Sequence, residues 1–148
     1  RRLAEAVMDR LEPLLAREKA KLVAARAGWT GRTALPGGDF AIDAFEEQLA
    51  ALRARYAFLP EDLLRRLFTY YGSRLPLVLG HAKSLSDLGR TFGAGLTEAE
   101  VDYLMREEWA QSAEDIVFRR SKLGLKMRSE DIAALDRFLE GKRQSLAG

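Results

Sequence analysis

Apolar residues recur at helical spacing along most of the chain, most clearly in the stretch 96–125. In the first half of this stretch they fall at positions i, i+3, i+4 and i+8, which share one face of an α-helix. These residues are Val101, Leu104, Met105 and Trp109. In the second half, Ile116 and Val117 begin the buried side of another helix. The stretch therefore predicts two helices joined by a tight corner, around which the rest of the chain packs.

Polar residues mark where these two helices begin. Thr97 is followed three residues later by Glu100, and Ser112 is followed at the same spacing by Asp115. Pairs of this kind form capping boxes, in which each side chain accepts a hydrogen bond from the backbone N–H of the other residue. We therefore expect both pairs to close the first turn of a helix.

The same periodicity predicts a helix near each end of the chain. Leucine and valine form a stripe from Leu3 to Leu15, and Pro13 should bend this helix or end its first part, because proline lacks an N–H. Residues 17–27 are predicted to be an exposed helical extension. Ser129 is expected to cap a final helix, with residues from Gly141 onward forming a frayed tail. Its inward residues are expected to be Ile132, Leu135 and Leu139.

Shorter helices are expected in the middle of the chain. Asp43 is expected to cap one of them, and Pro60 should open the next at its first helical position. Gly72 and Gly80 are expected just past two helix ends, and one more helical turn should lie within residues 84–95. The inward faces of the first two are predicted to be Phe45, Leu49, Leu52 and Tyr56, then Leu63, Leu64, Leu67, Phe68 and Tyr71.

The segment 28–42 has no apolar stripe and is predicted to be one long irregular loop. Pro36 and Gly37 have the signature of a type II turn, and Trp29 and Phe40 are expected to pin the loop to the core. No convincing strand-like alternation is present in the sequence. The predicted fold is all-α, an orthogonal bundle of about six helices in a single domain spanning residues 1–148.

Composition changes this picture little. The 148 residues include no cysteine, which excludes disulfides and thiol catalysis. The sequence contains neither an apolar run long enough to span a membrane nor a visible signal peptide, so a cytoplasmic location is expected. With 24 basic and 22 acidic residues, the net charge of +2 gives no argument for nucleic acid as a partner.

Charge is unevenly distributed around the predicted corner. Seven acidic residues and one basic residue lie in 98–115, whereas 119–128 holds five basic residues and no acidic one. Such blocks indicate internal pairing or a polarised surface, and Glu108 could reach Arg119 and Arg120 across the corner. The predicted interaction surface consists of Arg119, Arg120, Lys122 and Glu108.

The residue types that carry chemistry do not form a recognisable constellation. His81 is the one histidine and is interpreted as structural, because no second histidine or metal-ligand spacing accompanies it. Tyr70 is expected to be more exposed than the core aromatic residue Tyr71. Neither a G-x-G-x-x-G nor a G-K-[ST] fingerprint occurs. The residues alone therefore predict a helical accessory or interaction domain without catalytic, cofactor-binding or metal-binding residues.

Several motifs nevertheless resemble a known family. They are LTEAEVDYL from Leu96, EWA from Glu108, the D-x-x-x-RR-x-K-LGL run from Asp115, LPGGDF from Leu35 and YYG from Tyr70. Together they resemble the helical C-terminal domain of the FAD-dependent, respiratory glycerol-3-phosphate dehydrogenases. The first residues, RRLAEAVMDRL, are similar to the helix that leaves the flavin domain in that family.

This resemblance implies a function for a larger protein. Enzymes of the family oxidise sn-glycerol 3-phosphate to dihydroxyacetone phosphate, reduce FAD and deliver electrons to membrane quinone. The chain would then be an accessory domain without a cofactor of its own, and its partner would be a preceding flavin domain. A homodimer and a peripheral contact with the inner face of the membrane are further expectations for that protein.

Two alternatives come from other classes. The basic run from Arg119 to Arg128 could make the chain a free-standing module that binds nucleic acid or anionic membrane. Against a DNA-reading corner, the second helix begins AEDIVF and would present carboxylates to phosphates. A small enzyme would instead need a pocket that contains His81 and a carboxylate.

Overall fold

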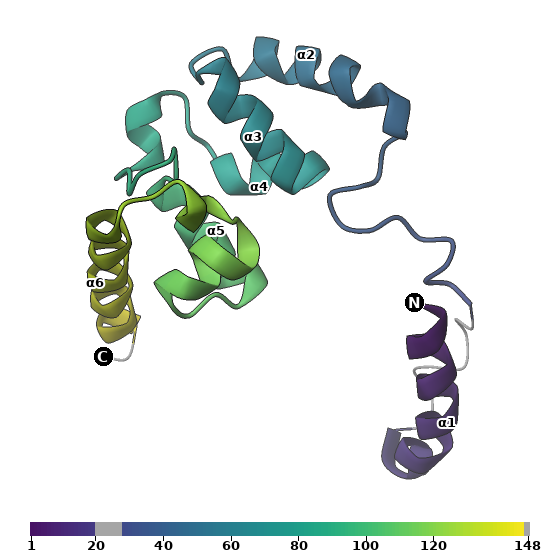
Figure 1. The fold of residues 1–148 in the computed structure, drawn as a ribbon. Coiled ribbons are helices and arrows are strands. Elements are labelled where there is room, and N and C mark those ends of the chain that lie inside the picture. The colour runs from purple at the N-terminus through teal and green to yellow at the C-terminus, as the bar shows by residue number, and fades with distance from the viewer. Residues whose placement is uncertain (20–27, 147–148) are drawn as a thin grey trace. The chain divides into compact units, whose positions relative to one another are not determined.

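The computed structural model describes residues 1–19 and 28–146, and every regular element in these ranges is helical (Figure 1). In these ranges six α-helices are joined by 3-10 turns and one π-helix, which confirms the predicted all-α fold. Within the described ranges, β pairing is limited to one isolated bridge between Thr91 and Thr97. None of the described helices has the length and hydrophobicity that crossing a bilayer requires. The contacts divide the chain into two units, residues 1–39 and 40–148.

The first unit consists of helix α1 (Arg2–Lys19) and part of the irregular segment. Pro13 lies inside α1 and does not end it. The carboxylate of Glu5 accepts a hydrogen bond from the Thr30 backbone N–H at 3.0 Å, and Arg1 donates to the carbonyl oxygen of Thr33 at 2.7 Å. These bonds tie the helix to the segment that starts at residue 28. Most of the predicted extension, residues 17–27, lies outside the described residues.

The irregular segment contains the predicted type II turn. Gly37 has a φ of +89°, and the N–H of Gly38 donates to the carbonyl oxygen of Leu35 at 2.8 Å. Phe40 stacks on Phe68 with ring centroids 5.4 Å apart, as expected of an anchor. The prediction for Trp29 was wrong, because this residue is 44% exposed. Its carbonyl oxygen, which accepts bonds from two following N–H groups, closes the local turn instead.

The second unit buries its core between short helices. These are α2 (Phe45–Arg55), α3 (Glu61–Tyr71), α4 (Leu75–Leu79), α5 (Glu98–Glu108) and α6 (Ser129–Leu146). Helix α2 packs on α3, α3 on α4, and α4 on α5 (Figure 1). The predicted inward faces are confirmed. Leu49, Leu64, Leu67, Leu135 and Leu139 are at most 1% exposed.

Several helix ends differ from their predicted positions. Asp43 lies within the 3-10 turn Ile42–Ala44, so it does not cap α2. Pro60 occupies the N-cap position of α3, one residue earlier than predicted. Helix α6 continues past Gly141 to Leu146, because Lys142 pairs with Asp102 and Glu98 of α5 and holds the last turns in place. The predicted ends at Gly72 and Gly80 and the turn Leu85–Leu88 are confirmed.

The predicted corner is present, but its two capping boxes differ. Ser112 and Asp115 exchange both bonds, each at 3.1 Å. Thr97 accepts a bond from the N–H of Glu100 at 3.4 Å, whereas the Glu100 side chain points into the core and does not return the bond. The second helix has π geometry over Asp115–Arg120. Both the N–H and the hydroxyl of Ser121 donate to the carbonyl oxygen of Ile116, which closes this wider turn.

Trp109 does not lie on the inward face of α5, contrary to the prediction. Helix α5 ends at Glu108, and Trp109 takes a left-handed conformation with a φ of +55°. This conformation turns the indole outward, where it is 83% exposed, and leaves Ala110 buried in the corner. A left-handed backbone is unfavourable for a bulky side chain. The corner therefore holds a strained and almost fully exposed tryptophan.

Replacing Trp109 by glycine should stabilise the isolated chain. The Trp109→Gly variant removes the left-handed strain and little buried surface, so the free energy of unfolding should rise by roughly 1 kcal/mol. Urea denaturation followed by circular dichroism measures the change. The matched control is Trp109→Ala, which keeps a Cβ in the left-handed conformation and should leave stability nearly unchanged. A glycine variant less stable than the alanine variant would contradict this account of the strain.

Candidate functional site

A buried ion pair lies between α3 and α5. The carboxylate of Glu100 is fully buried, and the guanidinium of Arg66 donates to both of its oxygens at 2.8 Å. The hydroxyl of Tyr71 donates to the same carboxylate, also at 2.8 Å. Arg66 donates further to the carbonyl oxygen of Gly95 at 2.7 Å. One guanidinium therefore joins α3 to α5 and to the loop that precedes α5.

Arg66 and Tyr71 together stabilise the buried negative charge of Glu100. A buried carboxylate is costly unless it is paired and its lone pairs are hydrogen-bonded, and Glu100 meets both conditions. Burial, together with the negative charge of Glu100 beside it, raises the pKa of the Tyr71 hydroxyl above its ordinary value. Tyr71 is therefore a neutral hydrogen-bond donor throughout the physiological pH range. We call Glu100, Arg66 and Tyr71 the buried triad.

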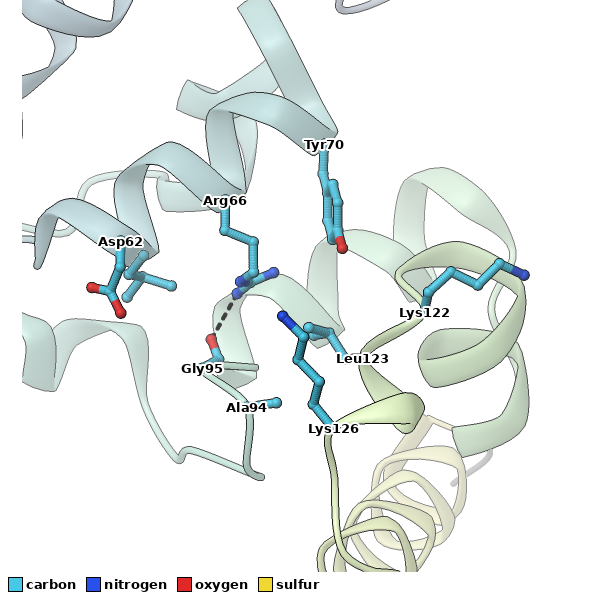
Figure 2. Close-up of a pocket in the computed structure, with 9 residues that line it drawn as sticks. Asp62, Arg66, Tyr70, Ala94, Gly95, Lys122, Leu123 and Lys126 are labelled. Atoms are coloured by element: carbon cyan, nitrogen blue, oxygen red, sulfur yellow. Dashed lines mark hydrogen bonds between the residues drawn. The ribbon is translucent and has the colours of Figure 1, made fainter.

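A pocket of about 320 Å³ opens beside the buried triad (Figure 2). Helix α3 contributes Asp62, Arg66 and Tyr70, which are spaced at i, i+4 and i+8 and so share one helical face. The second wall is the loop before α5, at Ala94 and Gly95. The third wall is the segment that follows the π-helix. It contributes Lys122, Leu123 and Lys126.

The loop that forms the second wall has an unusual backbone. Gly93, Ala94 and Gly95 have successive φ values of +112°, +47° and +74°. The turn is closed by a hydrogen bond from the N–H of Leu96 to the carbonyl oxygen of Gly93 at 2.9 Å. A Cβ at Gly93 would lie 2.9 Å from an oxygen of Asp131, so this position requires glycine. Because Arg66 holds the carbonyl of Gly95, the loop is fixed on both sides.

The cations of the pocket differ in how they are paired. Arg66 is paired with Glu100, and the ammonium group of Lys122 donates to the carbonyl oxygen of Phe118. Within the described residues, the Lys126 ammonium has neither an ion-pair nor a hydrogen-bond partner. Figure 2 shows it directed toward the part of α3 that carries Arg66 and Tyr70. Tyr70 is 45% exposed, and Arg66 lies 5.7 Å from the centroid of its ring.

The structure divides the predicted interaction surface into two parts. Arg120 donates to the carbonyl oxygen of Glu108 at 2.9 Å and lies 3.8 Å from its carboxylate, so the predicted ion pair across the corner is confirmed for this residue. Arg119 pairs within its own segment, with Glu114 at 2.8 Å and Asp115 at 2.7 Å. Lys122 lies at the pocket instead. Two arginines of the basic run therefore neutralise the acidic block, as predicted.

The remaining candidates lie elsewhere. His81 is exposed in the turn after α4 and does not line the pocket. The described residues contain no group of three or more side chains suited to hold a metal ion. Sequence reasoning missed Arg66 and the pocket role of Asp62. The signal that could have revealed them is their i, i+4 spacing with Tyr70 on the polar edge of an otherwise apolar helix.

In its described part, the chain is thus an all-helical domain whose charged groups pair mainly with one another and whose corner presents an exposed tryptophan. The chain belongs to the family described as the C-terminal domain of alpha-glycerophosphate oxidase, which matches residues 28–146. The resemblance found in the sequence is thereby confirmed.

Curated relatives agree with this family. The chain is 39% identical to a glycerol-3-phosphate dehydrogenase of Pseudomonas aeruginosa over 96% of its length, and 37% identical to the aerobic glycerol-3-phosphate dehydrogenase of Escherichia coli over 94%. It is 41% identical to a D-erythritol 1-phosphate dehydrogenase of Brucella abortus over 72%. The chain spans 26% of the length of the first two relatives and 21% of the third. These relatives lend no support to a nucleic-acid-binding module.

Two neighbouring arginines of α3 provide a matched test of the buried triad. The Arg66→Met variant leaves Glu100 buried without its partner and should lower the free energy of unfolding by roughly 3 kcal/mol. Arg65 makes a similar bidentate ion pair with Glu46, but this pair lies on the surface. Arg65→Met should therefore lower the free energy of unfolding far less. Urea denaturation compares the two variants. Equal losses would show that burial of the pair contributes nothing.

Asp115, in the first turn of the second corner helix, should make the free energy of unfolding depend on pH in the acidic range. The backbone N–H of Gln111, together with Arg119 and Ser112, lowers the pKa of Asp115 from 3.8 to about 2. The stabilisation by the ionised group is therefore complete above the unfolded-state pKa and is lost as the pH falls toward the folded-state value. Asp115→Asn should remove this part of the acid dependence.

The measurement is urea denaturation between about pH 5 and about pH 2. The wild-type chain should lose more stability over this range than Asp115→Asn does. The control is Glu130→Gln, because the Glu130 carboxylate accepts no hydrogen bond within the described part of the chain. Parallel curves for the wild type and Asp115→Asn would refute the role given to Asp115.

Proposed function

We propose that this domain braces a larger FAD-dependent enzyme that oxidises glycerol 3-phosphate to dihydroxyacetone phosphate and passes the electrons to membrane quinone. The observation that carries the proposal is the match of nearly the whole chain to one quarter of two glycerol-3-phosphate dehydrogenases. Glycerol 3-phosphate is proposed as the substrate because the relatives that match nearly the whole chain are named glycerol-3-phosphate dehydrogenases. FAD and the reacting groups belong to the rest of the enzyme, which works at the inner face of the membrane.

The side chains of the domain support an accessory role. Glu100, the one buried carboxylate among the described residues, accepts three hydrogen bonds from Arg66 and Tyr71. The pocket residues that can donate or accept protons include no histidine. Such an arrangement suits a rigid brace better than a reaction centre. Proton transfer in this enzyme is therefore assigned to the flavin-bearing part.

Trp109 supports a docking role for the corner. Large aromatic residues that are exposed on a free domain are typical anchors of an interface, where their burial contributes much of the binding energy. The turn that presents the indole is held by two bonds from Arg120 to the carbonyl oxygen of Glu108. Because this turn is already fixed in the free domain, little conformational entropy is lost when the indole docks. We propose that Trp109 contacts the preceding flavin domain.

The test compares the isolated chain with the full-length protein. The isolated chain should be a folded, colourless helical protein that neither binds FAD nor reduces a dye with glycerol 3-phosphate. The full-length protein should contain FAD and perform the reaction, with erythritol 1-phosphate as the comparison substrate. Flavin binding or glycerol 3-phosphate oxidation by the isolated chain would overturn the accessory role. Faster oxidation of erythritol 1-phosphate would overturn the substrate assignment.

A further inference from the structure

We propose that the pocket between α3 and the segment after the π-helix binds the phosphate group of a small phosphate monoester. The inference concerns residues 62–126 and does not depend on the activity of the larger enzyme. It stands on three observations, namely the unpaired donors that face the pocket, the strained residues that line it and the distribution of charge between its two ends.

The donors come from two different elements. The Lys126 ammonium is directed into the pocket and has no partner within the described residues (Figure 2). The Tyr70 hydroxyl lies across from it on α3 and likewise makes no hydrogen bond within them. Arg66 uses both terminal nitrogens for Glu100 and Gly95, so its guanidinium is fixed in place at the pocket wall. A lysine ammonium and a hydroxyl on facing walls suit an oxyanion that accepts several bonds.

Backbone strain is concentrated at the same pocket. The described part of the chain has three non-glycine residues with positive φ, and two of them, Ala94 and Lys122, line the pocket. Gly95, between them along the wall, also has a positive φ of +74°. Left-handed non-glycine residues are unfavourable and cluster at binding and catalytic sites, where the strain positions a group. Here it brings the carbonyl oxygen of Gly95 within reach of Arg66.

The charges of the pocket select the ligand. The charge of Arg66 is balanced by Glu100, and the Lys122 ammonium points away from the pocket toward the carbonyl oxygen of Phe118. The positive charge of Lys126 and the negative charge of Asp62 therefore remain at the pocket. Figure 2 shows Asp62 at the far side of Arg66 from Lys126, so an anionic group is favoured at the lysine end and repelled at the aspartate end. The ligand should therefore carry its charge at one end only, with a neutral group toward Asp62.

The volume and the walls fit such a molecule. At about 320 Å³, the pocket lies at the lower end of the size range of ligand sites. Leu63 and Leu123 supply apolar wall beside the donors, and Asp62 can accept a hydrogen bond from a hydroxyl group. A phosphate monoester with a short hydroxylated or apolar stem can contact the donors, the apolar wall and Asp62 at the same time.

The probe for the test is inorganic phosphate, titrated into the 148-residue chain at constant ionic strength and followed by nitrogen-15 NMR. Phosphate should shift the amide signals of Ala94, Gly95 and Leu123 saturably. Removing a charge-assisted bond with Lys126→Gln should weaken binding about tenfold, whereas Lys83→Gln, an exposed lysine outside the pocket, should change it less than about twofold.

Two further arms complete the test. Tyr70→Phe removes only the hydroxyl and should weaken binding about threefold, and it serves as the second variant if Lys126→Gln does not fold. Acetate at the same ionic strength should bind more weakly than phosphate. Unchanged phosphate binding in Lys126→Gln, shifts spread over surface lysines alone, or equal binding of acetate would each overturn the assignment.

Discussion

The pairing of one buried carboxylate with one guanidinium is the interaction on which the second unit depends. Glu100 stands in the first turn of α5, where the flanking residues are apolar, and its charge is removed from water completely. Such a charge is tolerated only because Arg66 and Tyr71 engage it from α3. The requirement fixes the position of α3 against α5 more narrowly than leucine packing alone, because hydrogen bonds are directional and dispersion contacts are not.

The geometry of the pocket follows from the same pair. Once Arg66 is turned toward Glu100, the helical face that carries it also directs Asp62 and Tyr70 toward the loop before α5. The bond from Arg66 to Gly95 then holds that loop in its left-handed conformation. A constraint that stabilises the fold therefore also shapes the cavity. The corner is held separately, by Arg120 on the carbonyl of Glu108 and by the capping box of Ser112 and Asp115.

Periodicity in the sequence predicted the helices and most of their buried faces, because burial repeats every 3.6 residues wherever a helix covers a core. It failed where a local motif and a tertiary contact compete for one residue. Glu100 fits a capping box, but the buried guanidinium of Arg66 binds its carboxylate more strongly than a backbone N–H does. Trp109 continues the apolar stripe of α5, yet the helix has already ended at Glu108. The pocket joins residues about sixty positions apart, a contact that no local spacing reveals.

The two kinds of strain in the second unit have different consequences. At Ala94 the left-handed backbone is compensated within the unit, since the bond from Arg66 to Gly95 and the turn closed at Gly93 hold it. At Trp109 the strained backbone carries an indole that is exposed to solvent. Neither the packing of the corner nor the bonds from Arg120 to the carbonyl oxygen of Glu108 require this side chain. Stability alone would favour glycine at such a helix end. Strained and exposed residues of this kind are retained where a contact outside the domain compensates for them. The proposed contact between Trp109 and the preceding flavin domain would provide this compensation.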